Sequence, residues 1–416
     1  MNIKKISIQN FKGFEYIKLR FNPRMTVLIG DNGAGKTSVL DAMSFVLGTF
    51  LLGIDGAANR PLRDSEKRKM RLSRNNVEVQ LPFRITVEHT LEGKAYEWFR
   101  ESKSVKGGVN YKHASELINR AKALTAAVRK GDEMVNLPLI AYYGIERLSI
   151  GKRNKRNYAR RSSRLDGYHK ALNPQSFKHK FLKWFKTYED EVLKFQVDQR
   201  QYKAFTGAIT GVVKDWTDIH YSWAEDDMMG QLPDGSWMPF GLLSDGYRNI
   251  VRLAADIAYR AIQLNPHLGE NAITETEGVV LVDELDMHLH PKWQRTIIED
   301  LKRTFPKIQF IITTHSPFIV QSLAADEVIN LEENTLTENP SDLSLEENIL
   351  FMGVEDHKSD KFVQKSKVAA EYLKMLEDDK VDDKVLAQLD KMLEEFSDDP
   401  VFVARLEMQR LDKLGK

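Results

Sequence analysis

Cysteine is absent from all 416 residues of the chain. Its absence excludes disulfide bonds, thiolate metal sites and catalysis by a cysteine nucleophile, and a reducing compartment is the expected environment. Long apolar runs are also lacking, because the most apolar window, Phe45 to Ile54, is too short to span a bilayer. The opening residues, Met1 to Lys5, lead into an alternating pattern instead of the apolar block of a signal peptide. We therefore expect a soluble, cytoplasmic protein with no membrane partner.

A large net charge is missing as well, since 61 Lys and Arg balance 60 Asp and Glu. The charges are nevertheless segregated along the chain. Residues 151–187 contain twelve Lys and Arg against one acid, Asp166, whereas residues 326–399 contain 22 acids against eight lysines. The basic segment is a candidate nucleic-acid contact, because cations of this density neutralise phosphates. The acidic segment is either a solvated cap or a dock for a basic partner or for the chain's own basic segment.

A phosphate-binding pattern organises the N-terminal part of the chain. The apolar run Met25 to Ile29 predicts a strand, which is followed by the sequence GDNGAGKTS and then by a helical stretch. This order fits the P-loop form G-x-x-x-x-G-K-[ST], in which glycines let successive backbone N–H groups face one anion. Lys36 is expected to reach the β- and γ-phosphates of a nucleotide, and Thr37 to ligate Mg²⁺. The expected nucleotide contacts are Asn32, Gly33, Ala34, Gly35, Lys36, Thr37 and Ser38.

Two apolar strands further along the chain end in residues suited to nucleotide hydrolysis. Gly278 to Val282 is followed by Asp283 and Glu284, which is the Walker B form. In that form Asp283 holds the Mg²⁺ shell, and Glu284 orients or deprotonates the attacking water. The strand Phe310 to Thr314 leads to His315, which is placed to contact a γ-phosphate; a structural histidine at a strand end is the alternative. ATP and Mg²⁺ are therefore the expected cofactors.

Two other patterns have an ordinary structural reading beside a functional one. His288 and His290 suggest a metal pair, but no third ligand is evident. Residues 177–195 place apolar and aromatic side chains on one helical face, which is typical of a core helix; stacking on single-stranded bases is the alternative. The members of this stripe are Phe177, Phe181, Trp184, Phe185, Tyr188, Val192 and Phe195.

The stretch Gly241 to Arg248, with the sequence GLLSDGYR, resembles the signature motif of ABC-type ATPases, whose usual form is L-S-G-G-Q. Asp245 and Tyr247 depart from that form. The resemblance implies a head-to-tail homodimer with two ATP molecules between the protomers, in which Ser244 and Gly246 face the γ-phosphate held by the other P-loop. Ser244 is expected to be the N-cap of the helix that follows, which suits this role. The resemblance also implies that Asp286 belongs to the D-loop and contacts the nucleotide, and that His315 is the switch histidine. The lobe junction, residues 142–147, contains no glutamine for the Q-loop role.

The pattern KISIQNFKGF within Ile3 to Phe14 resembles the RecF and SMC branch of these ATPases. Phrases such as LPLIAYYGIERL and VVLVDELDMHLHPKWQR resemble the bacterial predicted ATP-binding proteins that include PtuA of Septu and retron anti-phage systems. This resemblance implies a separate HNH nuclease as partner, controlled by the nucleotide state of the ATPase. Neither a TOPRIM nor an HNH pattern is found in the chain, so no intrinsic nuclease activity is expected. The alternatives are a RecF-like DNA clamp or loader that grips DNA through residues 151–187, and a mainly structural dimer with slow turnover.

The expected fold class is α/β, an ABC-type P-loop ATPase head with a mixed sheet and a helical signature lobe. Residues 1–150 are expected to form its P-loop part and residues 240–335 its signature, Walker B and switch part. Residues 151–239 are expected to be a basic helical insert. Residues 336–416 are expected to be an acidic helical region and a candidate partner dock, with three short amphipathic helices. An antiparallel hairpin is expected to precede the P-loop strand.

Overall fold

The computed structural model describes residues 1–73, 76–105, 108–145, 163–173, 180–195, 199–332, 339–353, 360–377, 383–394, 396 and 399–414. Its contacts divide the chain into two units, Met1–Asn348 and Ile349–Lys416, which are described separately below. The sequence-based boundaries at residues 150, 239 and 335 remain predictions.

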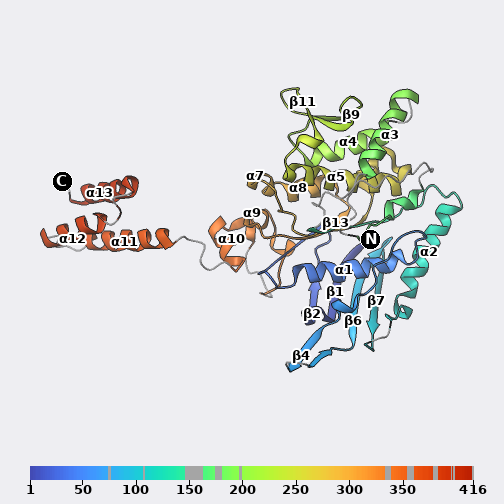
Figure 1. Ribbon diagram of the computed structural model, residues 1–416, viewed down its shortest axis with the longest axis horizontal. Coiled ribbons are helices and arrows are strands. Elements are labelled where there is room, and N and C mark those ends of the chain that lie inside the picture. Colours follow the sequence, from blue (N-terminus) through green and yellow to red (C-terminus); the bar gives the residue numbers. More distant parts are fainter. Residues whose placement is uncertain are drawn as a thin grey trace. The chain divides into compact units, whose positions relative to one another are not determined.

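The first unit begins with an antiparallel sheet in the strand order β2-β1-β6-β7 (Figure 1). The predicted hairpin before the P-loop strand is confirmed, because β1 pairs with β2 antiparallel. Alternate side chains of β1 and β6 are buried, as period-two patterning requires. The strands are β1 (Asn2–Phe11), β2 (Phe14–Arg20), β6 (Phe83–Leu91) and β7 (Lys94–Ser102).

A parallel sheet with the order β14-β3-β13-β12-β8 forms the core of the same unit. Every residue of β3, β8, β12 and β13 is buried, which explains why these strands read as continuous apolar runs in the sequence. The strands are β3 (Met25–Ile29), β8 (Leu139–Tyr143), β12 (Gly278–Val282), β13 (Ile308–Thr313) and β14 (Val328–Asn330).

Helix α1 lies between the two sheets, since it contacts β1 and β6 as well as β12 and β13. Helix α2 packs on α1, while α5 packs on β8; α1 and α5 lie on opposite sides of β13 in the view of Figure 1. The P-loop helix is therefore held from both sheets. The long helices of this unit are α1 (Lys36–Leu51), α2 (Ser115–Arg129), α3 (Lys180–Phe195), α4 (Arg200–Val212) and α5 (Asp245–Leu264).

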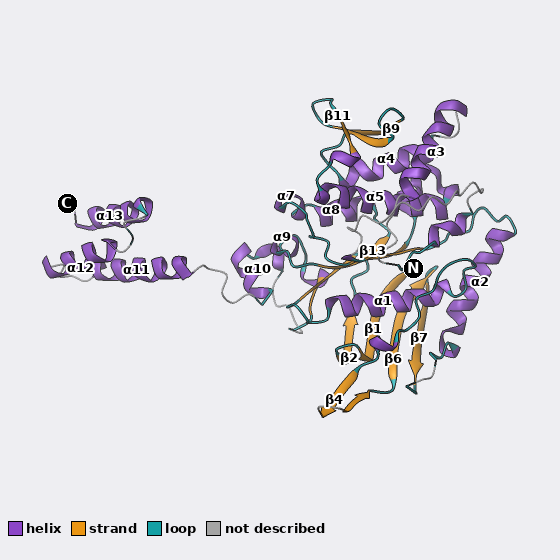
Figure 2. Cartoon of the chain, in the orientation of Figure 1, coloured by secondary structure: helices purple, strands orange, loops and turns teal. Residues whose placement is uncertain are grey.

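The prediction that residues 151–239 are helical was incomplete. Beside α3 and α4, this part contains an antiparallel sheet of β9 (Asp218–Ser222), β10 (Asp227–Gln231) and β11 (Trp237–Pro239) (Figure 2). These strands are short and end in tight turns, so they give little periodic signal beside the helical pattern of the preceding stretch. Seven of the twelve Lys and Arg of the basic segment lie in residues 151–162 and 174–179, outside the described residues.

The described part of the aromatic stripe is part of a core. Phe185 is buried and stacks on Phe205 and Tyr202, while Trp184 meets Phe205 edge-on and contacts Tyr259. These contacts favour the core interpretation of the stripe over stacking on bases.

Two short helices follow the loop after β12. Helix α7 (Pro291–Gln294) ends after one turn, and α8 (Ile297–Thr304) begins three residues later. The Gln294 side chain donates to the Leu289 carbonyl and accepts from Ser316, so the first turn is tethered to neighbouring loops. The remaining short helices are α6 (Ala272–Glu275), α9 (Pro317–Val320) and α10 (Leu345–Phe351).

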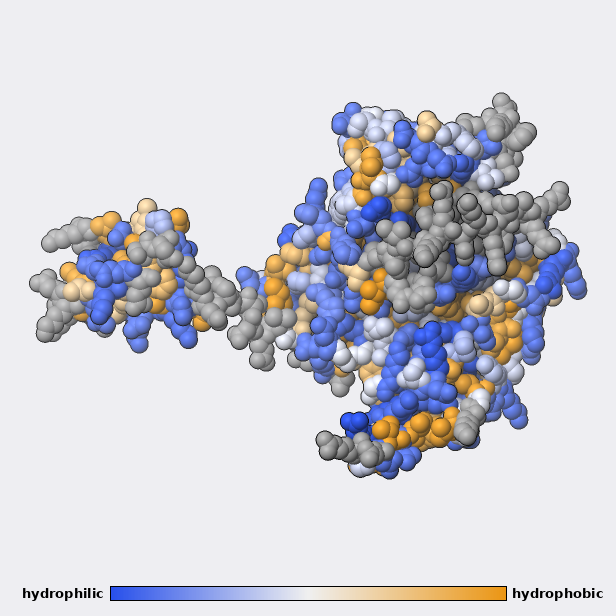
Figure 3. All heavy atoms as spheres, viewed as in Figure 1, coloured by the Kyte–Doolittle hydropathy of each residue, from blue (hydrophilic) through white to orange (hydrophobic). Residues whose placement is uncertain are grey.

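A two-stranded ribbon, β4 (Lys69–Ser73) and β5 (Asn76–Val79), extends from the first unit with apolar side chains in solvent. Figure 3 shows hydrophobic residues gathered at this end of an otherwise largely hydrophilic visible surface. Leu72 and Val77 are 60% and 50% exposed. No helix among the described residues is both long and apolar enough to cross a membrane.

The second unit contains the three predicted C-terminal helices: α11 (Asp360–Glu377), α12 (Asp383–Glu394) and α13 (Pro400–Leu414). Their shared core is formed by Tyr372, Leu376, Leu389, Leu393 and Leu406. The helices thus bury a small apolar core of their own.

Candidate nucleotide site

The candidate site lies where three neighbouring parallel strands end. Strands β3, β13 and β12 are adjacent, so the loops after Ile29, Thr313 and Val282 meet at one edge of the sheet. Ligands of open parallel sheets bind at the carboxyl ends of the strands. The sheet order thus brings together the P-loop, Asp283 with Glu284, and the segment that contains His315.

Positive backbone angles form the P-loop, as its glycines allow. Gly33 and Gly35 have φ of 101° and 99°, and α1 begins immediately afterwards at Lys36. A Cβ added to Gly35 would lie 2.4 Å from Cζ of Phe14, whereas one added to Gly33 would meet nothing within 4 Å. The loop is thus backed by the Phe14 ring at one glycine and open at the other.

Lys36 is buried and turned into the loop. Its Nζ donates to the carbonyl oxygens of Gly30 and Asp31 at 2.7 and 3.0 Å. Burial lowers the pKa of Lys36, while the negative charges of Glu332, Glu284 and Asp283, in that order, oppose this effect. The ammonium group therefore lies among carboxylates and loop carbonyls. Their negative charge offsets part of the effect of burial on its pKa.

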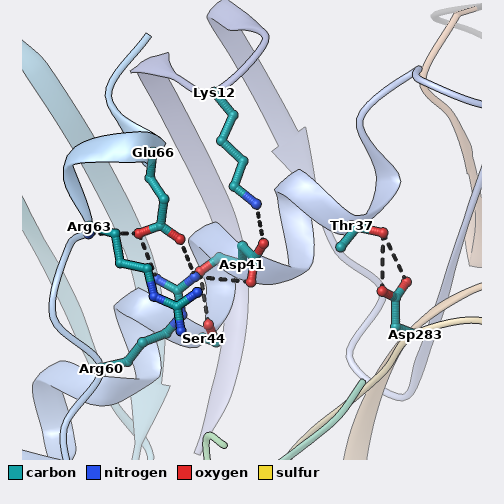
Figure 4. A network of polar contacts seen from close by, with 8 residues as sticks. All are labelled: Lys12, Thr37, Asp41, Ser44, Arg60, Arg63, Glu66 and Asp283. Carbon is teal, nitrogen blue, oxygen red and sulfur yellow. Dashed lines mark hydrogen bonds and ion pairs between the residues drawn. The ribbon is translucent and has the colours of Figure 1, made fainter. Parts of the chain in front are cut away.

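Thr37 and Asp283 are hydrogen-bonded to each other (Figure 4). The Thr37 hydroxyl donates to the two Asp283 carboxylate oxygens at 3.0 and 3.3 Å. A second hydroxyl, from Thr313, donates to Asp283 Oδ1 at 2.6 Å and accepts from the Glu284 amide at 2.7 Å. The P-loop helix and two strand ends are thereby joined through one carboxylate.

Glu284 has a backbone conformation that is unusual for a side-chain-bearing residue. Its φ is +49°, and His288, four residues later, has φ +62°. Such left-handed residues cost free energy and cluster at functional sites. The Glu284 amide is held by Thr313, so the strained residue is fixed from the neighbouring strand.

Asp286 connects the loop after β12 to the segment after β13. Its Oδ1 accepts from the Thr314 hydroxyl at 2.6 Å and from the His315 amide at 3.2 Å. The carboxylate therefore positions the backbone at His315. The sequence had suggested Asp286 as a nucleotide contact, and this internal role was not predicted.

The signature-like residues lie on α5, against the loop that follows Walker B. Ser244 is the N-cap of α5 and accepts from the Tyr247 amide at 3.4 Å, as its sequence position predicted. Gly246 is packed so closely that an added Cβ would lie 2.0 Å from the His288 carbonyl oxygen. Ahead of this motif, Leu242 is 77% exposed.

Two contacts of the P-loop were not anticipated from the sequence. Glu332, beyond β14, accepts from the Asp31 amide at 3.1 Å, and no local pattern marks it. Phe14 follows the first hairpin, and only the close approach of its ring to Gly35 gives it a role at the loop.

A buried ion-pair network supports the P-loop helix from behind (Figure 4). Arg60 donates to Asp41 on α1 at 2.9 Å and to Glu66 at 3.2 Å, and Lys12 forms an ion pair with the same Asp41. Because each buried charge has a partner, this network fixes α1 against the first hairpin at limited electrostatic cost.

The residues at this edge fit a nucleoside triphosphate with a divalent cation. Gly33 is open to an anion, Lys36 supplies a cation, and Thr37 and Asp283 are oxygen ligands of the kind that Mg²⁺ prefers. Among the described residues no group of three or more His, Asp and Glu is arranged to hold a metal by itself. A cation here would therefore need the phosphates as further ligands.

A P-loop joined to a carboxylate at the end of a parallel strand defines a nucleotide-binding site of the P-loop class. The sequence matches the RecF/RecN/SMC N terminal domain family over residues 2–338. The chain belongs to this family.

The chain is also similar to individual proteins. The chain is 28% identical over 396 residues to the retron Vc95 probable ATPase of Vibrio cholerae serotype O1 biovar El Tor, covering 80% of this chain and 74% of that protein. It is 27% identical over 346 residues to the Septu protein PtuA of Bacillus thuringiensis, covering 79% and 75%. The solved SMC head domain of Thermotoga maritima aligns with a TM-score of 0.45 and 15% identity, covering 80% of this chain and 97% of that structure.

Proposed function

We propose that this chain binds and hydrolyses ATP, dimerises around it, and controls a separate HNH-type nuclease in anti-phage defence. The observation that carries the proposal is the hydrogen bond between Thr37 and Asp283 beside the buried Lys36. It joins the hydroxyl and the carboxylate that hold Mg²⁺ in P-loop nucleotide hydrolases.

Each residue of the site has a distinct task in hydrolysis. The P-loop amides and Lys36 bind the phosphates and offset their charge, while Thr37 and Asp283 hold the cation. Glu284 orients the attacking water and accepts its proton, and His315 contacts the terminal phosphate. Bound MgATP supplies the phosphoanhydride that is cleaved and a counter-charge for its oxygens.

Dimerisation is supported by the resemblance of residues 241–248 to the signature motif. In ABC-type ATPases this motif, which here includes Ser244 and Gly246, caps a nucleotide held by the second subunit. Opening and closing of the dimer would then follow ATP binding and hydrolysis.

The regulatory role is supported by the relatives, which include a retron ATPase and a Septu protein. The expected partner is a separate HNH nuclease, docked in part on the C-terminal helices. The proposal is tested by expressing the tagged chain with its genomic neighbours, purifying it in ATP, and identifying what co-elutes. A stoichiometric nuclease with ATP turnover is the expected result; a chain that neither hydrolyses ATP nor retains a protein partner would refute the proposal.

A RecF-like DNA clamp is the second candidate, favoured by membership of the RecF/RecN/SMC family. It would bind DNA through residues 151–187, dependent on ATP and sensitive to salt. Recovery of the chain alone on DNA in the same experiment would favour this candidate.

A further inference from the structure

A small cavity lies behind the signature-like motif, apart from the nucleotide site. Its volume is about 150 Å³, and its lining residues come from the end of α4, the start of α5, and helices α7 and α8. Figure 1 shows where these helices lie. Its apolar lining is made by Val212, Val213, Tyr247, Ile250, Trp293 and Ile297.

The size of this cavity restricts what can fill it. A cavity of about 150 Å³ accommodates a group roughly as large as a benzene ring. Sites for whole cofactors and drug-sized molecules usually measure roughly 300–1,000 Å³. The cavity is therefore suited to a single anchoring side chain of a protein, as found at the centres of protein interfaces.

Two aromatic rings give the cavity a fixed wall. Tyr247 and Trp293 meet edge-on with ring centroids 4.1 Å apart. The Tyr247 hydroxyl donates to Asp215 at 2.9 Å, and burial together with this carboxylate raises the pKa of Tyr247. Because the hydroxyl is already bonded within the chain, the ring face is left for apolar contact.

The rim of the cavity carries two lysines, Lys214 and Lys292, and two aspartates, Asp215 and Asp300, with Arg303 beside Asp300, so three cations face two carboxylates. Lys292 is exposed, and among the described residues no ion pair is found for it. Lys214 is 54% exposed and contacts Asp300 at 3.0 Å, but Asp300 is shared with Arg303 at 2.8 Å. Two cations therefore share one buried carboxylate, and the rim has positive charge available for an acidic partner.

We propose that a partner protein inserts one aromatic or branched apolar side chain, flanked by acidic residues, into this cavity. The side chain contacts Tyr247, the third residue of α5, and Trp293 on α7, which follows the D-loop. Gly246, next to Tyr247 in the chain, already packs against the His288 carbonyl. The partner thereby stabilises the contact between the signature-like motif and the D-loop. This inference rests on the proposed function, because it assigns a docking surface to the regulated partner.

The test uses the complex that co-purifies with the full-length chain. Thr296→Trp fills the cavity mouth, and Lys292→Glu reverses a rim charge without altering the core. We expect Thr296→Trp to weaken partner binding by about thirtyfold or more, as loss of an anchor site does, and Lys292→Glu to weaken it several-fold. Lys69→Glu, on the exposed ribbon, is the matched charge control and should leave binding unchanged. Melting temperature and ATP affinity identify any variant that fails to fold.

A photo-crosslinking residue at position 292 reports where the partner lies. The expected crosslink joins an acidic partner segment that contains an aromatic or branched apolar residue, and the same probe at position 69 gives none. Partner affinity within about twofold of wild type for both cavity variants, or a crosslink to a segment without acids, would overturn the inference while leaving the proposed function intact. Absence of any partner would refute both.

Discussion

Tyr143 donates a hydrogen bond to Asp256 at 2.8 Å inside the first unit. Tyr143 ends β8, next to Walker B, and its carbonyl oxygen accepts from the Asp283 amide at 2.8 Å. Asp256 lies on α5, the helix that begins at Ser244, and also accepts from Arg260 at 2.6 Å. Burial and the Asp256 charge raise the pKa of Tyr143, so its hydroxyl remains a donor. A buried contact thus connects Walker B to the signature helix, where no Q-loop glutamine was found in the sequence.

Removal of this contact should affect coupling and stability together. Tyr143→Phe leaves Asp256 with one donor fewer and should destabilise the fold by about 1.5–3 kcal/mol, because the lost bond is to a charged group. It should also lower kcat for ATP, measured by phosphate release. The control is Tyr168→Phe: this equally buried tyrosine donates to the Pro138 carbonyl at 2.8 Å instead of to a side chain of α5. If both variants keep wild-type kcat, the contact has only a structural role.

Gly35 should be far less replaceable than Gly33. Both have positive φ, so an alanine costs about 1–2 kcal/mol at either position, but only at Gly35 would the new Cβ approach Phe14. We expect Gly35→Ala to lower the melting temperature and ATP affinity more than Gly33→Ala does. Adding Phe14→Leu should restore part of the loss. Equal effects of the two alanines would show that Phe14 does not back the loop.

Replacing Thr313 should lower the turnover of ATP more than its binding. Its hydroxyl holds both Asp283 and the Glu284 amide, so Thr313→Val removes two contacts of hydrolytic residues while keeping the strand packed. A decrease in kcat of about 10–100-fold with little change in ATP affinity is expected, as for other residues that orient ligating side chains. The control is Thr26→Val, which removes a hydroxyl bonded to Asn22 in the same sheet. An unchanged kcat for Thr313→Val would contradict this role.

Acid should destabilise the N-terminal sheet through His89. Burial lowers the pKa of His89 from 6.5 to about 4, and its Nδ1 accepts from Trp98 at 3.1 Å. At a pH between these two pKa values, the unfolded chain takes up a proton that the folded chain does not. Stability therefore decreases as pH falls from 6.5 towards 4. Urea midpoints at pH 7.5 and 5 should differ more for wild type than for His89→Asn, which keeps an acceptor for Trp98 but does not titrate. Equal differences would contradict this assignment.

Local patterns in the sequence predicted the strands and the helix that flank the candidate site, because each of these parts is short and contiguous. The P-loop lies between an apolar strand and a helix, and Asp283 directly follows another apolar strand. Ser244 was recognisable as an N-cap because a hydroxyl there satisfies a free helix amide.

Contacts between distant segments could not be predicted in this way. Glu332 lies 301 residues from the Asp31 amide that it accepts from, and Tyr143 lies 113 residues from Asp256. No local pattern in the sequence indicates either pair, because the two partners meet only in the tertiary fold. The sheet of β9 to β11 was missed for a related reason, since strands of three to five residues carry little periodic signal.

The most direct test of the account is the ATP-dependent assembly of Glu284→Gln, which should bind nucleotide but hydrolyse it slowly. Light scattering in MgATP should give twice the monomer mass for this variant, and the monomer mass without nucleotide or when Lys36→Ala is added. ATP binding and dimer formation together would support a nucleotide-controlled switch. A variant that binds ATP yet stays monomeric would contradict the proposed ATP-bridged dimer, and one that does not bind ATP would contradict the nucleotide site itself.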